Sequence, residues 1–94
     1  MVQVQCEVSA GLRSTEATVA IADVHNHQQC LRVERDFLTT LKGQWFLPVG
    51  VVYDEPAKPW VLIELPHEAD SGANRLWVWR EHLLLGNGAE HDPV

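Results

Sequence analysis

The chain has 94 residues, enough for one small domain, because domains usually run from about 50 to 250 residues. Hydrophobic residues make up 46% of it and charged residues 21%, which is the composition of a folded protein and not of a disordered one. Seven Lys and Arg against thirteen Asp and Glu give a net charge of -6. This charge repels phosphate backbones and anionic lipids, so it argues against sequence-independent binding of nucleic acid or membranes.

The first strand signal lies at the N-terminus, where apolar and polar residues alternate with a period of two from Val2 to Val8. Such alternation is typical of a strand with one buried face. β-branched and apolar runs predict further strands over residues 15–24, 30–34, 44–53, 60–65 and 76–79. Pro48 and Gly50 predict a bend, a bulge or an edge position in the fourth of these six strands. Residues 60–65 form the most apolar run, which is expected to be buried on both faces.

The connections between these strands carry turn-forming residues. Residues 35–38 are long enough for one helical turn, and Asn26 and Lys42-Gly43 indicate turns. The long loop 66–75 offers oxygen ligands, but their spacing does not match a calcium loop, so Gly72 and Asn74 are interpreted as turn formers. We expect residues 1–85 to form one β domain and residues 86–94 a flexible tail.

An internal repeat is suggested by the pattern L-x-V-x-R-[DE]-x-L, which occurs at residues 31–38 and again at 76–83. Upstream, residues 19–23 match 61–65, and residues 2–8 match 47–53. Either the chain consists of two three-stranded units, or two β-rich halves resemble each other through composition alone.

These elements predict an all-β fold, a small antiparallel barrel of about six short strands. The segment V-x-R-[DE]-x-L resembles the passage from sheet into a tight turn near the last strand of SH3-like small barrels. The resemblance implies a barrel that is SH3-like in size and style, and it implies nothing about function.

The candidate binding site centres on Trp77 and Trp79, which point to the same face of their predicted strand. In the matching segment Arg32 and Glu34 stand at these positions, and charged residues are rarely buried unpaired. The two indoles are therefore expected on the outer face, and exposed aromatic patches tend to mark interfaces. Together with loop 66–75, this face would bind another protein or a second copy of the chain. Its candidate residues are Trp77, Trp79, Trp60, Arg75 and Arg80, with Tyr53 as a further neighbour. The alternative is that the indoles close the barrel ends or pack beneath loop 66–75.

Other chemistries have less support in the sequence. The indoles could stack the bases of single-stranded nucleic acid, but only Arg75 and Arg80 lie close enough to follow a backbone. His25, His27 and Cys30 have the spacing of metal ligands, and Cys6 or His67 would have to supply a fourth. A small-ligand or metal-binding protein is therefore the alternative function, and the other interpretation of these residues is two turn histidines and a buried thiol.

We expect no cofactor and no catalysis, because the chain carries no phosphate loop, dinucleotide fingerprint or nucleophile elbow. A domain of this size also has little room for a small-molecule pocket of about 300 Å³. Two cysteines, Cys6 and Cys30, are too few for a disulfide framework, and the N-terminus lacks a signal sequence. We therefore expect a cytoplasmic protein with free thiols.

Overall fold

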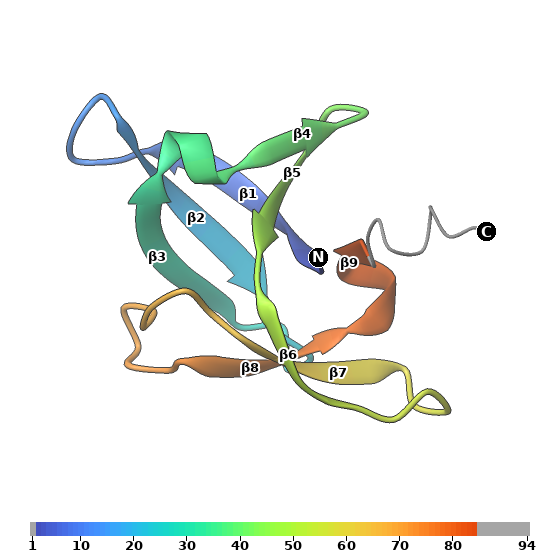
Figure 1. Ribbon diagram of the computed structural model, residues 1–94. Helices are drawn as coiled ribbons and strands as arrows, with labels where there is room; N and C mark the ends of the chain where they lie inside the picture. Colours follow the sequence, from blue (N-terminus) through green and yellow to red (C-terminus); the bar gives the residue numbers. More distant parts are fainter. Residues whose placement is uncertain (1, 85–94) are drawn as a thin grey trace.

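The computed structural model describes residues 2–84 and has an all-β fold of two antiparallel sheets (Figure 1). The larger sheet has the strand order β3-β2-β1-β5-β4, with β9 also paired to β1, and the smaller sheet has the order β6-β7-β8. The strands are β1 (Gln3–Ala10), β2 (Glu16–Ala22), β3 (Gln28–Glu34), β4 (Thr39–Leu41), β5 (Gln44–Pro48), β6 (Gly50–Asp54), β7 (Trp60–Glu64), β8 (Arg75–Trp79) and β9 (Leu83–Leu84). The 3-10 turns are η1 (Arg35–Phe37) and η2 (Arg80–His82). In residues 2–84, no helix is long and apolar enough to cross a membrane. The predicted tail, 86–94, lies outside the described residues.

The core lies between the two sheets and is built from the inward-facing residues of each strand. The period-two alternation predicted for β1 is confirmed, since Val4 and Cys6 are buried while Gln5 and Glu7 are exposed. The core residues are Val4, Cys6, Ala17, Val19, Ile21, Leu31, Val33, Leu38, Leu47, Val61, Ile63, Leu65, Ala69, Leu76 and Val78. Both cysteines are free thiols, with Cys6 buried and Cys30 half-buried.

One long segment, β5 followed by β6, belongs to both sheets. Figure 1 shows it leaving the larger sheet and passing into the smaller one. The break falls at Val49, between Pro48 and Gly50, where the sequence predicts a bend, a bulge or an edge position, and β6 lies at the edge of the smaller sheet. The N–H of Val49 donates to the carbonyl of Val2 at 3.0 Å, which holds the crossing point against the start of the chain.

Of the predicted small barrel of about six strands, the all-β antiparallel fold is confirmed, but no closure into a barrel is found, because the nine strands of residues 2–84 form two separate sheets. The free edges of β3 and β8 meet loops and not each other. The N–H of Asp70 donates to the carbonyl of Cys30 at 2.7 Å, and that of Val24 donates to the carbonyl of Trp77 at 2.9 Å. These isolated bonds tie the sheets together without continuing the strand pairing.

The strand predicted over 60–65 is buried on one face only. Val61 and Ile63 of β7 are buried, whereas Trp60 and Glu64 are exposed. β7 is the central strand of the smaller sheet, and the larger sheet covers only one of its faces. The other face is the surface that carries the candidate site.

The two halves of the chain share one pairing pattern. Val19 lies opposite Leu31 in the first half, as Ile63 lies opposite Leu76 in the second. Ala17 opposite Val33 corresponds in the same way to Val61 opposite Val78. The expected match of 19–23 with 61–65 is thus wrong by two residues, because pairing in the sheet aligns Val19 with Ile63 and not with Val61.

The matched L-x-V-x-R-[DE]-x-L segments fold alike. Each runs from a strand through a 3-10 turn into a short strand, β3-η1-β4 and β8-η2-β9. Both turns are closed by a leucine, Leu38 or Leu83, whose N–H donates to the carbonyl of the motif arginine. The last strand of each half then pairs with the first strand of the other half, β4 with β5 and β9 with β1.

The halves meet where β1 and β5 pair, around Val4 and Leu47, which lie opposite each other and are both 0% exposed. The registers match Val4 with Leu47, Gln3 with Phe46 and Gln5 with Pro48, so the pair of Gln3 with Pro48 exchanges with the pair of Gln5 with Phe46. The expected match of 2–8 with 47–53 is therefore also wrong by two residues. The registers therefore relate the halves by an approximate twofold axis through this point.

Candidate functional site: an aromatic face on the smaller sheet

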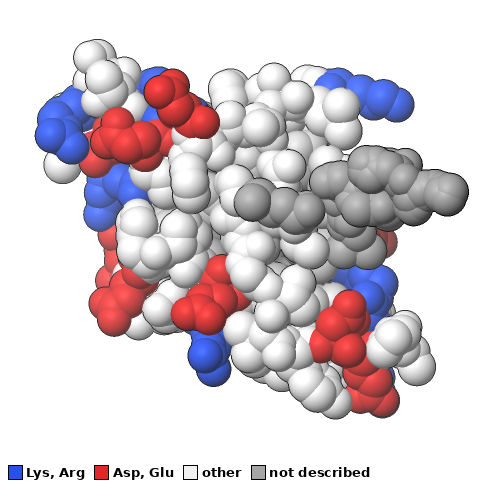
Figure 2. Space-filling model, in the orientation of Figure 1, with Lys and Arg blue, Asp and Glu red and all other residues white. Residues whose placement is uncertain are grey.

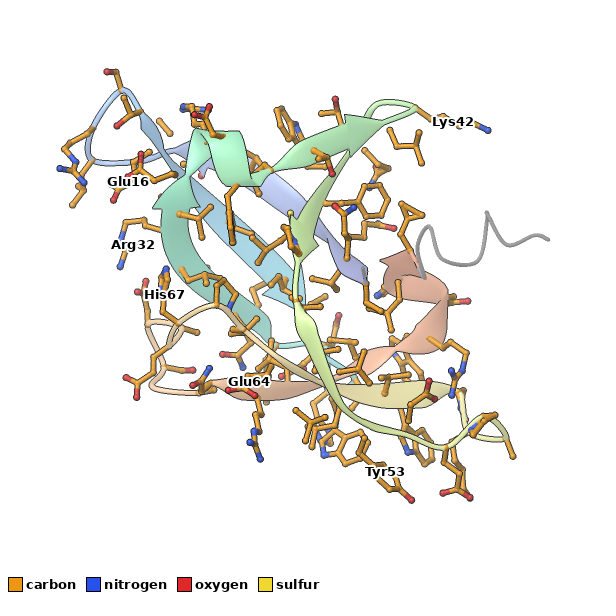
Figure 3. All side chains as sticks on the ribbon, in the orientation of Figure 1. Glu16, Arg32, Lys42, Tyr53, Glu64 and His67 are labelled. Carbon is orange, nitrogen blue, oxygen red and sulfur yellow. The ribbon has the colours of Figure 1, made fainter. Side chains whose placement is uncertain are left out.

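The outer face of the smaller sheet, turned away from the larger sheet, carries two rows of apolar side chains. Tyr53, Leu62 and Trp77 lie side by side on the three strands, and Trp60 lies opposite Trp79. Tyr53 is 52% exposed, and Trp60 and Trp77 are each 38% exposed, while Trp79 is half-buried. Figure 3 shows Tyr53 projecting outward from this sheet. We call these five residues the aromatic face, and they confirm that Trp77 and Trp79 share an outward orientation.

The rings of the aromatic face touch one another in pairs. Tyr53 and Trp77 meet edge to face, with ring centroids 6.1 Å apart. Trp60 and Trp79 are tilted, with centroids 6.4 Å apart, and the ammonium of Lys58 lies 5.9 Å from the Trp60 ring. Such contacts hold the rings in place, so the face is largely preorganised.

Charged side chains lie at the two ends of the aromatic face and largely neutralise each other. At one end Arg75 lies 3.8 Å from Glu64, and at the other Arg80 lies 2.8 Å from Asp54. Figure 2 shows both ends of the smaller sheet as adjacent red and blue groups with uncharged surface between them. The Tyr53 hydroxyl donates to Glu55 at 3.2 Å, a bond that raises the pKa of Tyr53.

The equivalent surface of the first half is polar. Trp77 corresponds to Arg32, Trp79 to Glu34 and Leu62 to Thr18, because these residues occupy matching register positions. The same architecture therefore folds with a solvated outer face, and the aromatic face is not a requirement of the fold.

Arg80 has a structural role. Its guanidinium donates to the carbonyls of Glu55 at 2.9 Å and of Lys58 at 2.8 and 3.1 Å, which fixes the β6-β7 turn. Arg35, the equivalent arginine, donates from Nε to the carbonyl of Ser14 at 3.1 Å. The repeated arginine of the motif thus ties the 3-10 turn to the first hairpin turn of each half. Arg75, by contrast, is exposed at the end of the aromatic face.

We expect Arg80→Ala to lower the free energy of unfolding by about 2 kcal/mol, because three charge-assisted hydrogen bonds to the carbonyls of Glu55 and Lys58 are lost. Urea unfolding followed by circular dichroism measures this change. Arg75→Ala is the matched control and should change stability by less than about 0.5 kcal/mol, since its ion pair is exposed. Equal stability of the two variants would contradict the structural role of Arg80.

Loop 66–75 is anchored to the edge of β3 and not folded over the indoles. Arg32 contacts Asp70 at 2.6 and 3.3 Å, an interaction that lowers the pKa of Asp70, and the Ser71 hydroxyl donates to Gln29 at 2.7 Å. Gly72 has a φ of 93°, in keeping with its predicted role in the turn. The side-chain oxygens of Asp70 and Ser71 therefore hold the loop in place.

The metal candidates His25, His27 and Cys30 are not brought together around a common point. In the described part of the chain, no group of three or more His, Cys, Asp and Glu side chains could hold a metal ion. The backbone N–H groups of His25 and His27 instead donate hydrogen bonds to Oδ1 of Asp23, each at 2.9 Å. Asn26 between them has a φ of 67°, which confirms the turn.

The next features are the buried thiol of Cys6, as a candidate nucleophile, and the surface hollows, as candidate small-molecule sites. Burial raises the pKa of Cys6 to about 12, so its thiol stays protonated at neutral pH and is a poor nucleophile or ligand. The expectation of little pocket space was too strict, because the surface has hollows of about 310 and 410 Å³. The larger one is lined by Pro59, Trp79, Arg80 and Glu81, at one end of the aromatic face.

Comparison with models of protein families, with curated proteins and with solved structures found no match. The site is therefore interpreted from its own geometry. Sequence reasoning missed Leu62, which lies between Tyr53 and Trp77. The alternation of Trp60, Leu62 and Glu64 with Val61 and Ile63 could have identified it, once the strand was taken as buried on one face only.

Proposed function

We propose that the protein is a non-catalytic interaction module of the cytoplasm that binds another protein through the aromatic face. The observation that carries this proposal is the contrast between the halves. Where the first half has Thr18, Arg32 and Glu34, the second exposes apolar and aromatic side chains at matching positions. Exposed Trp and Tyr side chains lower the solubility of a protein, and they are enriched among the residues that contribute most to binding energy.

We also propose a more specific description of the fold. We infer that the chain consists of two copies of one unit, arranged as an opened small barrel of SH3-like size and style. The correspondence of pairing registers, 3-10 turns and motif arginines supports the repeat. Likeness in size and style adds no argument for function.

Other functions have less support than protein binding. The aromatic face carries paired charges and no basic track, so it does not suit a phosphate backbone. His25, His27 and Cys30 do not converge on a site within residues 2–84.

The test compares three immobilised proteins in extract of the cells from which the chain comes: the wild type, Trp77→Arg and Trp45→Arg. Trp77→Arg installs the residue found at the matching position of the first half, so the variant should remain folded. Trp45 of β5, 37% exposed on the larger sheet, is the matched control. We expect proteins retained by wild type and Trp45→Arg to be lost, by tenfold or more, on Trp77→Arg. Equal retention by all three folded proteins would disprove the proposal.

A further inference from the structure

We propose that the partner contributes an extended strand, which adds to the smaller sheet along the free edge of β6. This strand is apolar in its middle and basic at its ends. The inference rests on the proposed function and names how the partner attaches and what chemistry it carries. β6 offers such a strand unpaired backbone groups, apolar side chains and acidic neighbours.

β6 is an edge strand of the smaller sheet, paired with β7 on one side only (Figure 1). In an antiparallel pair, alternate residues direct both their N–H and their carbonyl away from the neighbouring strand. Within residues 2–84, β6 makes no backbone hydrogen bond beyond its pairing with β7. Its outward-facing backbone groups are thus available to a further strand, which would pair at a spacing of about 4.8 Å.

The other strands at sheet edges are met by loops or are short. The carbonyl of Cys30 on β3 accepts the N–H of Asp70, and that of Trp77 on β8 accepts the N–H of Val24. β4 and β9 have three and two residues, whereas β6 has five, all of them exposed. In the described part of the chain, β6 is therefore an edge that accepts a five-residue strand without displacing a loop.

Apolar side chains are exposed on both faces of β6. Val51 lies opposite Ile63 and so points toward the core side of the sheet, yet it is 44% exposed at the sheet edge. Tyr53 is 52% exposed on the other side, where it belongs to the aromatic face. A strand added beside β6 would cover Val51 with one side chain and Tyr53 with another. Cross-strand contacts of this kind favour apolar residues in the middle of the partner strand.

A bulge at Val52 connects this edge with the aromatic face. The register of β6 shifts between Val51 and Tyr53, and the extra residue turns Tyr53 to the outer side, opposite Leu62. Without the extra residue, Tyr53 would share the inward direction of Val51, two positions earlier. A bulge can also guard an edge, but this one leaves apolar side chains exposed on both sides of it. A strand paired with β6 therefore lies directly beside the aromatic face.

The corresponding edge of the first half is polar. It is the end of β1, residues 7–10, which pairs with β2 alone. The registers match Gly50 with Glu7 and Tyr53 with Ser9. A charged side chain such as that of Glu7 protects an edge against strand addition, and β6 carries no charge before Asp54. The architecture therefore does not require the apolar edge that β6 presents.

Charge favours a partner strand with basic ends. Glu55 directly follows β6 and makes no ion pair with any described residue. Glu64 lies opposite Gly50, at the other end of β6, and its ion pair with Arg75 is exposed and 3.8 Å long. With a chain charge of -6, these carboxylates attract a strand that has Lys or Arg at its ends. The same net charge disfavours pairing with β6 of a second copy.

The experiment titrates the isotope-labelled protein with a synthetic peptide of five valines flanked by two lysines on each side, and follows the backbone N–H signals by NMR. We expect saturable shifts and slower hydrogen exchange over Gly50–Asp54, and neither over Thr39–Leu41 of β4. The same peptide with every valine nitrogen methylated keeps its side chains and charge but lacks the donors for strand pairing. It should bind at least tenfold more weakly.

Variants of Val51 test the edge itself. Val51→Lys and Val51→Glu should each weaken peptide binding by tenfold or more, because the added strand would bury either charge. Their opposite signs separate this effect from attraction or repulsion of the peptide lysines. Leu41→Lys and Leu41→Glu make the same charge changes at a position of β4 that is 49% exposed. These matched controls should alter binding by less than threefold, and circular dichroism checks that all four variants are folded.

Several results would overturn the inference. These are no shift at millimolar peptide, equal binding of the methylated peptide, shifts confined to β4, or the same β6 shifts on concentrating the protein without peptide. If extract proteins depend on Trp77 but are retained equally by wild type and Val51→Lys, strand addition fails and the proposed function stands. If extract proteins are retained equally by wild type and Trp77→Arg, the proposed function itself fails.

Discussion

Leu47→Ala is expected to lower the free energy of unfolding by about 3 kcal/mol, the largest effect of any substitution considered. Leu47 is 0% exposed and lies opposite Val4, where the first strands of the two halves pair. Truncating a fully buried leucine removes its transfer free energy and leaves a cavity, which costs about 2 to 5 kcal/mol. A small domain has about 5 to 15 kcal/mol in total, so the variant would keep only a narrow margin of stability.

Urea unfolding of Leu47→Ala and of Leu41→Ala measures this effect against a matched control. Leu41 is 49% exposed on β4, so its truncation should cost less than about 0.5 kcal/mol. A loss below 1 kcal/mol for Leu47→Ala would mean that the contact between the halves contributes little to the fold.

Asp23→Ala is expected to destabilise the protein by about 2 kcal/mol. Asp23 is 8% exposed and accepts the N–H groups of His25 and His27 and the amide of Gln29, the last at 3.2 Å. Alanine would leave these donors without their acceptor, and an unsatisfied buried polar group costs about 1 to 3 kcal/mol. Thermal unfolding at pH 7 measures the loss, and a Tm unchanged from wild type would contradict it.

The same carboxylate makes stability depend on pH. Burial acts to raise the pKa of Asp23, but hydrogen bonds from the backbone of His27, the side chain of Gln29 and the backbone of His25 outweigh it and lower the pKa. A lowered folded-state pKa stabilises the protein above the unfolded value of about 3.9, and this contribution is lost as pH falls through the folded pKa. Asp23→Asn should therefore be less stable than wild type at pH 7, with a gap that narrows below pH of about 4. A gap that stays constant down to pH 2 would contradict the assignment.

Much of the local structure could be predicted from the sequence. Strong alternation identified β1, Pro48 and Gly50 identified an irregularity at the point where the chain passes between the sheets, and Asn26 identified a turn. The pattern L-x-V-x-R-[DE]-x-L identified the two places where a strand passes into a tight turn. These features are encoded within a few neighbouring residues.

Features that depend on distant pairing could not be predicted in the same way. β4 and β9 are three and two residues long, too short to show a period of two, and each is defined by its partner in the other half. Loop 66–75 lies against the edge of β3, where the N–H of Asp70 donates to the carbonyl of Cys30, and no local sequence pattern encodes this contact.

The candidate site was partly predictable for the same reason. The outward direction of Trp77 and Trp79 followed from strand alternation and from Arg32 and Glu34 in the matching segment. The structural role of Arg80 could not be predicted from the sequence, because its hydrogen-bond acceptors belong to a turn more than twenty residues earlier in the chain. Sequence alone placed it beside the indoles and could not show that its donors are engaged.

The measurement that tests the central claim most directly is the indole N–H spectrum of the tryptophan-labelled protein, recorded in buffer and in extract of its own cells. Binding through the aromatic face predicts that the signals of Trp60, Trp77 and Trp79 shift or broaden in extract while that of Trp45 stays unchanged. If all four signals keep their positions and widths, or if Trp45 alone responds, the aromatic face is not the surface through which this protein acts.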